Sequence, residues 1–437
     1  MPHRLTARPL AAGVDPAGLF LALEGVAEDV FWLDAGADAD EGWSFVGTGE
    51  RSVLPAGVRL DVETPAPDGA PPFQGGWVGW YDYESGARRA GAPTAEGADP
   101  DGGAWLRVAR AVAFDHATGR AWALAGDEDL DSWERTVHEQ RPPASVTPFT
   151  GERIGARARH TPDEYAALIE RCRDLIRAGI AYQLCLTTRF TVPGAHDAVA
   201  AYLRLRSATP AHHGGFVRIG GRALLSASPE QFLHAAGGVI RTRPIKGTRP
   251  RGRDAETDAA LAAELAADPK ERAENVMIVD LMRNDLSQVC VPGSIRVDGL
   301  WVVESYPAVH QLVSTVSGTA APGTTAGALL DAAFPAGSMT GAPKLSAMTR
   351  LQALEGGPRG VYAGCFGYVG DDGGVDLAMV IRSIVVDADS AVVGAGGGIT
   401  WRSVPASEVA EVATKARAPL AALGAEMPEL WGSDILN

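Results

Sequence analysis

Strand-like runs alternate with helical segments over most of this chain of 437 residues. Thr161, Pro162 and Glu164 have the N-cap, the first-turn proline and the capping-box carboxylate of a helix start. We expect that helix to run to about residue 177, with Gly179 just past its end. A strand-like run follows at residues 183–192. Because this alternation continues, a mixed α/β fold is expected from about residue 150 onward.

The same patterns divide the chain into three parts. Residues 1–148 hold short apolar runs broken by Gly, Pro and Asp, which favour a β-rich part, and their end is linker-like from residue 141. Residues 155–425 form the second part, and residues 426–437 are expected to be a C-terminal tail. The other expected elements are helices at 256–286, with a break at Asp268-Pro269, and at 407–423, and strands at 361–369, 378–386 and 391–394.

Composition excludes several classes of protein. The net charge of -15 leaves no broad cationic face for nucleic acid, and no apolar run is long enough to span a bilayer. The first residues lack the apolar core of a secretory signal. The four cysteines form no CxxC pair, which favours reduced thiols over a disulfide framework or a zinc site. We therefore expect a cytoplasmic protein with no nucleic-acid or membrane partner.

A basic segment stands out against this acidic background. Six Lys and Arg side chains fall within the thirteen positions from Arg241 to Arg253. Pro244 and Gly247 interrupt the segment, so it is not an ordinary helix face. Like charges and partial burial would favour the neutral amine of Lys246, which makes it a candidate nucleophile. A basic loop that faces water or holds an anion is the alternative.

Glutamates in two expected helices form a second constellation. Glu274 shares an apolar stripe with Ile278, where a carboxylate is costly to bury without a partner. Glu408, Glu411 and Lys415 follow helical spacing. Glu411 and Lys415 are typical of a surface i,i+4 pair. Alternatively, glutamates from the two helices supply part of the oxygen shell that Mg²⁺ prefers.

Three familiar patterns fail on inspection. The segment from Gly337 to Lys344 resembles a phosphate loop, but its lysine does not follow the second glycine directly. The glycine run that ends at Gly398 is followed by Ile399 rather than by the start of a helix, so it is not a dinucleotide fingerprint; its backbone N–H groups are suited to a carboxylate. Cys365 is expected to be a buried strand cysteine rather than a nucleophile.

Several motifs occur in a fixed order along the chain. They are Ser228-Pro-Glu-Gln-Phe232, Pro244-Ile-Lys-Gly-Thr248, Arg272-Ala-Glu-Asn275, Pro307-Ala-Val-His-Gln-Leu-Val-Ser314, Ser338-Met-Thr-Gly-Ala-Pro-Lys344, Val380-Ile-Arg-Ser383 and Ala395-Gly-Gly-Gly398. Together they resemble the chorismate-utilising enzymes, from about residue 160 to 425 and more weakly at residues 73–84. The resemblance implies a single large α/β sandwich with mixed or antiparallel sheets around a cleft and helices outside.

Two positions bear on the reaction. The resemblance implies that Lys246 together with Gln183 is typical of the branch that converts chorismate and ammonia to 4-amino-4-deoxychorismate, the precursor of 4-aminobenzoate. Anthranilate-forming relatives usually have alanine at position 246, and isochorismate-forming relatives have lysine at position 183. An anthranilate-type or 2-amino synthase and a catalytically silent regulatory subunit are the alternatives.

The resemblance also implies a role for each site residue. Lys246 would attack C2 of chorismate, Glu230 would protonate the leaving C4 hydroxyl, and ammonia would then displace the lysine. Mg²⁺ would be held by Glu274 and Glu411. Ammonia would come from a separate glutamine amidotransferase subunit, because no amidotransferase motif is convincing in this chain. The expected substrate contacts are Gly247, Thr248, Ser338, Tyr362, Arg382, Gly396, Gly397, Gly398 and Lys415.

Overall fold

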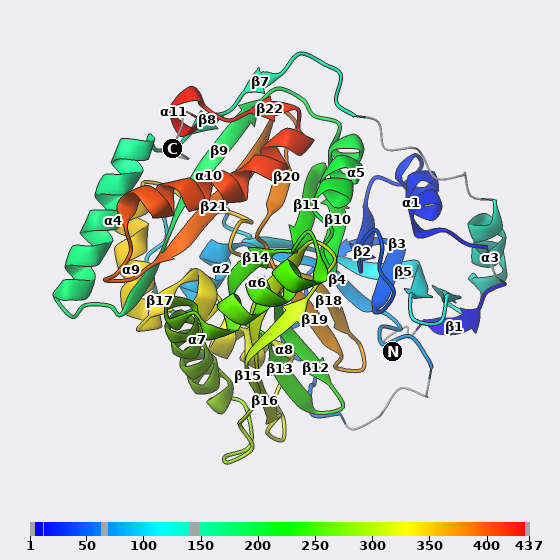
Figure 1. Ribbon diagram of the computed structural model, residues 1–437. Coiled ribbons are helices and arrows are strands. Elements are labelled where there is room, and N and C mark those ends of the chain that lie inside the picture. Colours follow the sequence, from blue (N-terminus) through cyan, green and yellow to red (C-terminus); the bar gives the residue numbers. More distant parts are fainter. Residues whose placement is uncertain (1–4, 12, 63–68, 140–147, 433–437) are drawn as a thin grey trace.

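A network of twenty antiparallel strands runs through the chain in the computed structural model, which describes residues 5–11, 13–62, 69–139 and 148–432 (Figure 1). Among these residues the only parallel pair is β7 with β22, which lies outside the network. The strands are β1 Thr6–Pro9, β2 Val30–Asp34, β3 Trp43–Ser52, β4 Gly76–Tyr81, β5 Gly103–Asp115, β6 Arg120–Ala125, β7 Ile154–Gly155, β8 Arg157–Ala158, β9 Gln183–Pro193, β10 His213–Ile219, β11 Arg222–Ser228, β12 Gln231–Ala236, β13 Val239–Thr242, β14 Ile245–Pro250, β15 Arg296–Ser305, β16 Val309–Thr319, β17 Gly341–Ala342, β18 Cys365–Gly370, β19 Val375–Met379, β20 Ser383–Val386, β21 Ser390–Ile399 and β22 Ala425–Glu426.

Helices cover the outside of the strands, as Figure 1 shows for α4, α5 and α10 over β9, β11 and β21. The fold is thus the expected mixed α/β arrangement of a large antiparallel sheet with helices. The helices are α1 Pro16–Glu24, α2 Tyr83–Arg89, α3 Leu130–His138, α4 Pro162–Arg177, α5 Ala198–Ala208, α6 Ala255–Ala267, α7 Pro269–Ser287, α8 Ala326–Ala333, α9 Lys344–Glu355, α10 Pro405–Ala422 and α11 Glu429–Gly432, with a 3-10 turn at Gly337–Met339.

Local sequence signals explain several of these boundaries. The predicted capping box of α4 is present, with Thr161 and Glu164 each bonded to the other's backbone N–H. The predicted break near residue 268 is confirmed, because Asp268 ends α6 and caps the N-terminus of α7 through the N–H groups of Lys270 and Glu271. The helix predicted at 407–423 is α10, which begins at Pro405.

Two of the predicted strands differ from the observed ones. The strand predicted at 378–386 is split into β19 and β20, and Arg382 between them has a φ of 53°. The strand predicted at 361–369 begins only at Cys365, because the preceding turn contains Ala363 at a φ of 64°. A left-handed residue cannot continue an extended strand, and apolar composition does not reveal where one occurs.

The hydrophobic core has parts of two kinds. One part packs α4, α5 and α10 against strands that include β9 and β21. Another is built by residues from strands and their connections alone, such as Phe31, Phe45 and Phe366, which is typical of sheet packed on sheet. Strands β2 and β4 from the N-terminal part pair with β10 and β18, so early and late segments share one network.

The division at 1–148, 155–425 and 426–437 stays a prediction, and residues 141–147 and 433–437 lie outside the described chain. All four cysteines are free and buried, as expected, and Cys365 lies in β18. Among the described residues, no helix is both long and apolar enough to cross a bilayer.

Candidate active site

Lys246 lies on β14 with a largely buried side chain. Gly247 follows at a φ of +79°, and a Cβ there would lie 2.7 Å from Leu265 of α6. Glycine is therefore required for α6 to pack closely on this strand. Thr248 is exposed and lies opposite Gln311 of β16. No hydrogen bond joins the Thr248 side chain to another predicted site residue within the described chain.

The cationic neighbours of Lys246 face other partners. Arg243 pairs with Glu304, Arg251 pairs with Asp258, and Arg249 pairs with Glu264 and Asp268. Burial opposes the charge on Lys246, but Glu274 and other nearby acidic groups outweigh burial and raise its pKa. The expectation that crowded cations keep this amine neutral is wrong for this structure, because acidic groups, Glu274 first, outweigh burial at Lys246.

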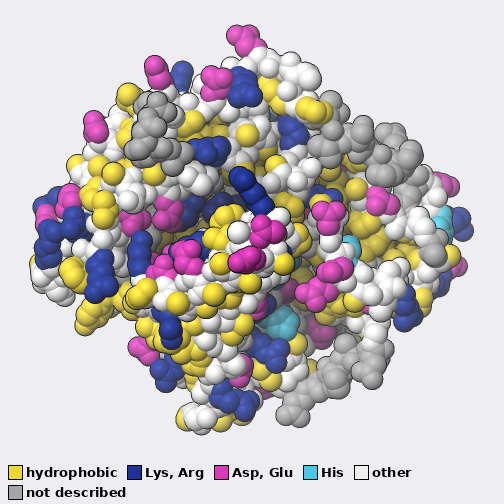
Figure 2. Space-filling model, viewed as in Figure 1, with side chains coloured by type: hydrophobic (Ala, Val, Ile, Leu, Met, Phe, Trp, Pro, Cys, Tyr) yellow, Lys and Arg dark blue, Asp and Glu magenta, His cyan; other side chains and the backbone are white. Residues whose placement is uncertain are grey.

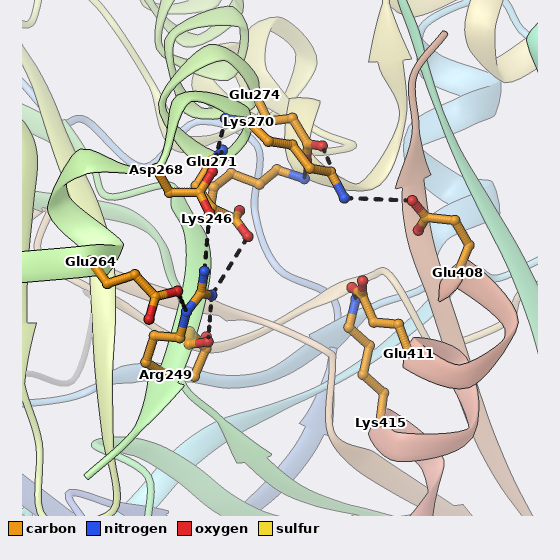
Figure 3. Close-up of polar contacts among 11 residues, drawn as sticks. Lys246, Arg249, Glu264, Asp268, Lys270, Glu271, Glu274, Glu408, Glu411 and Lys415 are labelled. Carbon is orange, nitrogen blue, oxygen red and sulfur yellow. Dashed lines mark hydrogen bonds and ion pairs between the residues drawn. The ribbon is translucent and has the colours of Figure 1, made fainter. Parts of the chain in front are cut away.

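Acidic and basic side chains meet where α7 and β14 face α10. Lys246 Nζ lies 3.8 Å from Glu274 Oε2, while Lys270 Nζ lies 3.9 Å from Glu274 Oε1 and 3.7 Å from Glu408 Oε1. Figure 3 shows the side chains of α7 and α10 facing one another across an open space. In Figure 2, charged side chains of both signs gather over this part of the surface. None of these three contacts is short enough for a hydrogen bond.

Glu411 and Lys415 form the predicted i,i+4 pair on α10, at 2.6 Å. The pair also belongs to the site, since Lys415 Nζ donates to the carbonyl of Gly396 at 2.9 Å. Burial alone would raise the pKa of Glu411, but Lys415, Lys246 and Lys270 lower it. The predicted ion pair is therefore present and lies against the glycine-rich strand, while the role of Glu411 in holding Mg²⁺ stays a prediction.

Glu230 lies between β11 and β12 and is buried. Ser338 Oγ donates to Glu230 Oε1 at 2.9 Å, so the structure brings these two predicted residues together. Burial raises the pKa of Glu230 to about 7, against the opposing effects of Ser338, Lys246 and Lys415. A glutamate at a strand end could also be a structural partner of a nearby arginine, but no arginine of the described chain pairs with Glu230.

The glycines of β21 allow side chains to approach the strand closely. A Cβ on Gly398 would lie 2.6 Å from Gln183 Nε2 and 3.2 Å from Lys246 Nζ, and one on Gly397 would lie 3.3 Å from Glu408 Oε2. Strand β20 pairs with β21 only as far as Val393. The edge that carries Gly396–398 therefore has no neighbouring strand on that side among the described residues, and Lys415 bonds the Gly396 carbonyl. Backbone N–H groups of consecutive glycines suit a carboxylate.

Two expected substrate contacts lie beside this edge. The Tyr362 ring packs on Gly394, where a Cβ would lie 2.1 Å from the ring. Burial lowers the pKa of Arg382, and Tyr362 and Glu411 oppose that shift. No ion pair to Arg382 occurs among the described residues, so its guanidinium is available to an anion.

Sequence reasoning missed Lys270 and Glu408 as site residues and used Gln183 only to separate branches. Both amide atoms of Gln183 are buried and lack a hydrogen-bond partner within the described chain. The rarity of lysine in the sequence was a signal that could have pointed to Lys270. The chain has only four lysines among 39 basic residues, and three of them, Lys246, Lys270 and Lys415, lie here.

The donor set suits a hard divalent cation. Glu274 Oε1 is buried without a hydrogen-bond partner, and the carboxylates of Glu408 and Glu411 face it from α10. Oxygen ligands of this kind are those that Mg²⁺ prefers, usually one or two from the protein. As arranged here, no three His, Cys, Asp or Glu groups of the described residues converge on one point, because Lys270 and Lys415 lie among the carboxylates.

Comparison with known proteins assigns the family. The sequence profile of the chorismate binding enzymes matches residues 48–421. The chain is 44% identical over 367 residues to an aminodeoxychorismate synthase of Streptomyces pristinaespiralis, covering 80% of this chain but only 51% of that relative. It is 40% identical over 377 residues to anthranilate synthase component 1 of Streptomyces coelicolor, covering 81% of this chain and 74% of the relative.

A solved structure agrees with this assignment. Anthranilate synthase component I from Streptococcus pneumoniae superposes with a TM-score of 0.72 at 28% sequence identity, covering 96% of this chain and 92% of that one. The chain spans about half the length of the aminodeoxychorismate synthase that it matches. On the profile match over most of its length, this chain belongs to the chorismate binding enzyme family.

Proposed function

We propose that this chain aminates chorismate at C4 to give 4-amino-4-deoxychorismate, through a covalent bond to Lys246. The observation that carries the proposal is the buried amine of Lys246 between Glu274 and Gln183, with Glu230 as a second, separately held carboxyl. The similarity to an aminodeoxychorismate synthase supports it. Anthranilate formation is the second candidate, because a relative with that name is almost equally similar.

Two allylic displacements account for the reaction. The Lys246 amine attacks C2, the ring double bond shifts, and the C4 hydroxyl leaves as water with a proton from Glu230. Ammonia then attacks C4, the double bond shifts back, and the Lys246 amine leaves. The carboxylate of Glu230 takes the extra proton from the new C4 ammonium group. A pKa of about 7 suits Glu230 to both transfers near neutral pH.

We further propose that Glu274 and Glu411 hold Mg²⁺. The unpartnered Oε1 of Glu274 supports this. When bound, the cation would neutralise a substrate carboxylate and offset the negative charges that now raise the pKa of Lys246. Glu408 lies one turn before Glu411 on α10 and is suited to binding a water of the cation.

The remaining residues would orient chorismate. The unpaired guanidinium of Arg382 suits one carboxylate of the substrate as a bidentate donor. The open edge at Gly396–398 would add backbone N–H donors beside Tyr362. Lys415, already bonded to the Gly396 carbonyl, would place a positive charge at the same end. Gly247, Thr248 and Ser338 would lie against the substrate, while Gly247 also lets α6 pack on β14 and Ser338 also holds Glu230.

Ammonia would be supplied by a separate glutamine amidotransferase subunit. The word component in the name of a relative supports a protein of more than one part. Four free, buried cysteines support the further proposal of a cytoplasmic location.

Product analysis tests the reaction. The purified chain is incubated with chorismate, Mg²⁺ and an ammonium salt at mildly alkaline pH, and products are separated by chromatography. We expect a product that yields 4-aminobenzoate only after a suitable lyase is added. Direct formation of fluorescent anthranilate would overturn the proposal in favour of the second candidate, and failure to consume chorismate would indicate a silent subunit.

Mass spectrometry tests the covalent step. With chorismate and Mg²⁺ but no ammonia, the intact protein is expected to gain the mass of chorismate minus water. Because the chain has only four lysines, peptide mapping assigns the modified residue without ambiguity. An unmodified protein that still aminates chorismate, or modification at another lysine, would contradict the role of Lys246.

A further inference from the structure

A second cavity, of about 320 Å³, lies beside the candidate active site. It is lined by Arg189 and Thr191 of β9. Their side chains lie on the same face of the strand as Gln183, because an even number of positions separates them from it. Tyr362 lies over Gly394 and forms a wall shared by the cavity and the candidate active site. Six residues of strand separate Gln183 from Arg189, or about 20 Å. The cavity is therefore separate from the candidate active site, although both lie on the face of β9 that carries Gln183.

The volume suits a small molecule rather than bound solvent. A single water takes about 30 Å³ of liquid volume, and binding pockets for small molecules begin at roughly 300 Å³. The lining is rich in charged and polar side chains. A purely apolar occupant would leave these groups without partners, which is costly in a buried site.

Arg189 supplies a cation without a direct partner, and the acidic groups Glu84 and Asp387 act on it only at a distance. Its guanidinium forms no hydrogen bond or ion pair with the described residues, and its Nη2 lies 3.5 Å from where a Cβ of Gly360 would be. Burial lowers the pKa of Arg189, and Arg159 adds to that shift. An arginine always carries its charge in a protein, so the site favours an anion here.

Asp82 supplies a carboxyl group on another part of the wall, and the cations Arg222 and Arg88 act on it only at a distance. It is 2% exposed, and its Oδ1 has no hydrogen-bond partner within the described chain. It precedes α2 but makes no capping hydrogen bond to that helix. Burial raises the pKa of Asp82 to about 7, and Glu84 and Asp99 add to the rise.

The two unpaired groups lie on either side of one loop. Tyr83, next to Asp82, donates its backbone N–H to the Gly360 carbonyl, and Arg189 reaches the same glycine. The other two cations of the wall are already paired. Arg222 bonds Asp387 at 2.8 Å and Asp99 at 3.2 Å, and Arg359 bonds Glu355 at 2.7 Å. The cavity thus leaves one basic and one acidic side chain without a direct ion-pair partner.

We propose that this cavity binds a free amino acid, whose carboxylate pairs with Arg189 and whose ammonium group pairs with Asp82. A ligand with both charges pairs with Arg189 and Asp82 at once, whereas a simple anion or a simple amine leaves one of these two buried side chains unpaired. The cavity limits the ligand to a small molecule. The proposal does not depend on which reaction the chain catalyses.

Chemical derivatives test the charges. The common free amino acids are screened against the full chain by thermal shift, and each hit is measured by isothermal titration calorimetry. The best ligand is then compared with its N-acetyl form, which lacks the ammonium group, and its amide, which lacks the carboxylate. We expect each derivative to bind at least tenfold more weakly. The absence of any amino-acid binding at millimolar concentration, or equal binding of either derivative, would overturn the proposal.

Matched variants test the location. Asp82→Asn is expected to bind the N-acetyl form as well as the free amino acid, while Arg189→Gln is expected to lose its preference over the amide. His213→Gln, in the separate cavity beside Asp34 and Asp376, should leave binding unchanged. Loss of binding in His213→Gln alone would move the ligand to that other cavity and refute the assignment. If a variant fails to fold, binding of the N-acetyl and amide derivatives to the unaltered chain still tests the proposal.

Discussion

Two buried charge clusters adjoin Cys185 of β9 and are built in opposite ways. In the first, Arg359 donates two hydrogen bonds to Glu355, at 2.7 and 2.8 Å, and further bonds to the carbonyls of Met339 and Cys185, at 2.6 and 2.8 Å. Glu355 Oε1 also accepts from the Thr187 N–H at 2.9 Å. This cluster has all the partners that a buried ion pair needs.

The second cluster lacks them. Lys246, Lys270, Glu274 and Glu408 approach one another only to between 3.7 and 3.9 Å. Glu274 Oε1 and the amide of Gln183 have no hydrogen-bond partner among the described residues. Buried groups without partners cost stability, and such costs are typical of functional sites. We infer from this difference that the Arg359 cluster stabilises the fold, whereas the Lys246 cluster has polar groups available to bind a ligand.

Replacing Lys246 should produce the largest effect on activity with little effect on stability. We expect Lys246→Met to lower kcat by at least ~10³-fold, because the proposed nucleophile is lost. The free energy of unfolding should fall by less than in the Arg359 variant below, because Lys246 makes no short hydrogen bond to Glu274 and Lys270 remains beside that carboxylate. Steady-state product assays and urea unfolding measure the two quantities. A large loss of stability would mean that Lys246 has the structural role here assigned to Arg359.

Replacing Arg359 should produce the opposite result. Arg359→Met leaves Glu355 buried without its counter-charge, so the free energy of unfolding should fall by about 3–5 kcal/mol. Urea unfolding monitored by tryptophan fluorescence measures the change. The double variant Arg359→Met with Glu355→Gln is the control, and it should recover part of the loss because no unpaired charge remains. Equal losses in the single and double variants would show that packing rather than charge is responsible.

Local signals in the sequence were sufficient for elements whose boundaries are set within one turn. The capping box at Thr161 and the Asp268-Pro269 break are both present, because caps and prolines act on the backbone next to them. The family motifs also singled out Glu230 and Ser338 separately, and the structure joins them by a hydrogen bond that was not predicted.

Contacts between distant segments could not be predicted from those signals. The arginines near Lys246 looked like a source of repulsion, but α6, β15 and Asp268, between α6 and α7, supply carboxylates that pair with three of them. Lys270 bridges α7 and α10, whose spacing in sequence carries no sign of their contact. The left-handed conformation of Arg382 is likewise set by the surrounding fold rather than by its own preference.

Glu230 offers a smaller test, through the pH dependence of the reaction. We expect Glu230→Gln to lower kcat by roughly 10²-fold, because it removes a general acid. For the unaltered chain, kcat should fall as pH rises through about 7, where Glu230 loses its proton. Ser338→Ala should move that fall to higher pH, because the Ser338 hydrogen bond lowers the pKa of Glu230. A pH profile that is the same in both variants and in the unaltered chain would exclude Glu230 as the acid.

The titration of Glu230 should also make the free energy of unfolding depend on pH. The pKa of Glu230 in the folded chain, about 7, is above its ordinary value of 4.5, so folding favours the neutral form. Its contribution to stability is complete below pH 4.5 and is lost as pH rises toward 7. Urea unfolding of Glu230→Gln across this range should therefore lack that part of the decline.

The smallest expected effect concerns the cation between the two helices. Lys270 lies between the carboxylates of Glu274 and Glu408, and its side chain is 47% exposed. Lys270→Met adds one uncompensated negative charge to the cluster, so Mg²⁺ should bind roughly tenfold more tightly, since charges a few ångströms apart interact by about 1–4 kcal/mol near a protein surface. Isothermal titration without substrate measures the affinity. Arg283→Met removes the same charge from an exposed position of α7, where Arg283 pairs with Asp280, and should leave the affinity unchanged. Equal gains in both variants would reflect net charge alone, whereas weaker binding in Lys270→Met would mean that this lysine helps to hold the carboxylates in place for the cation.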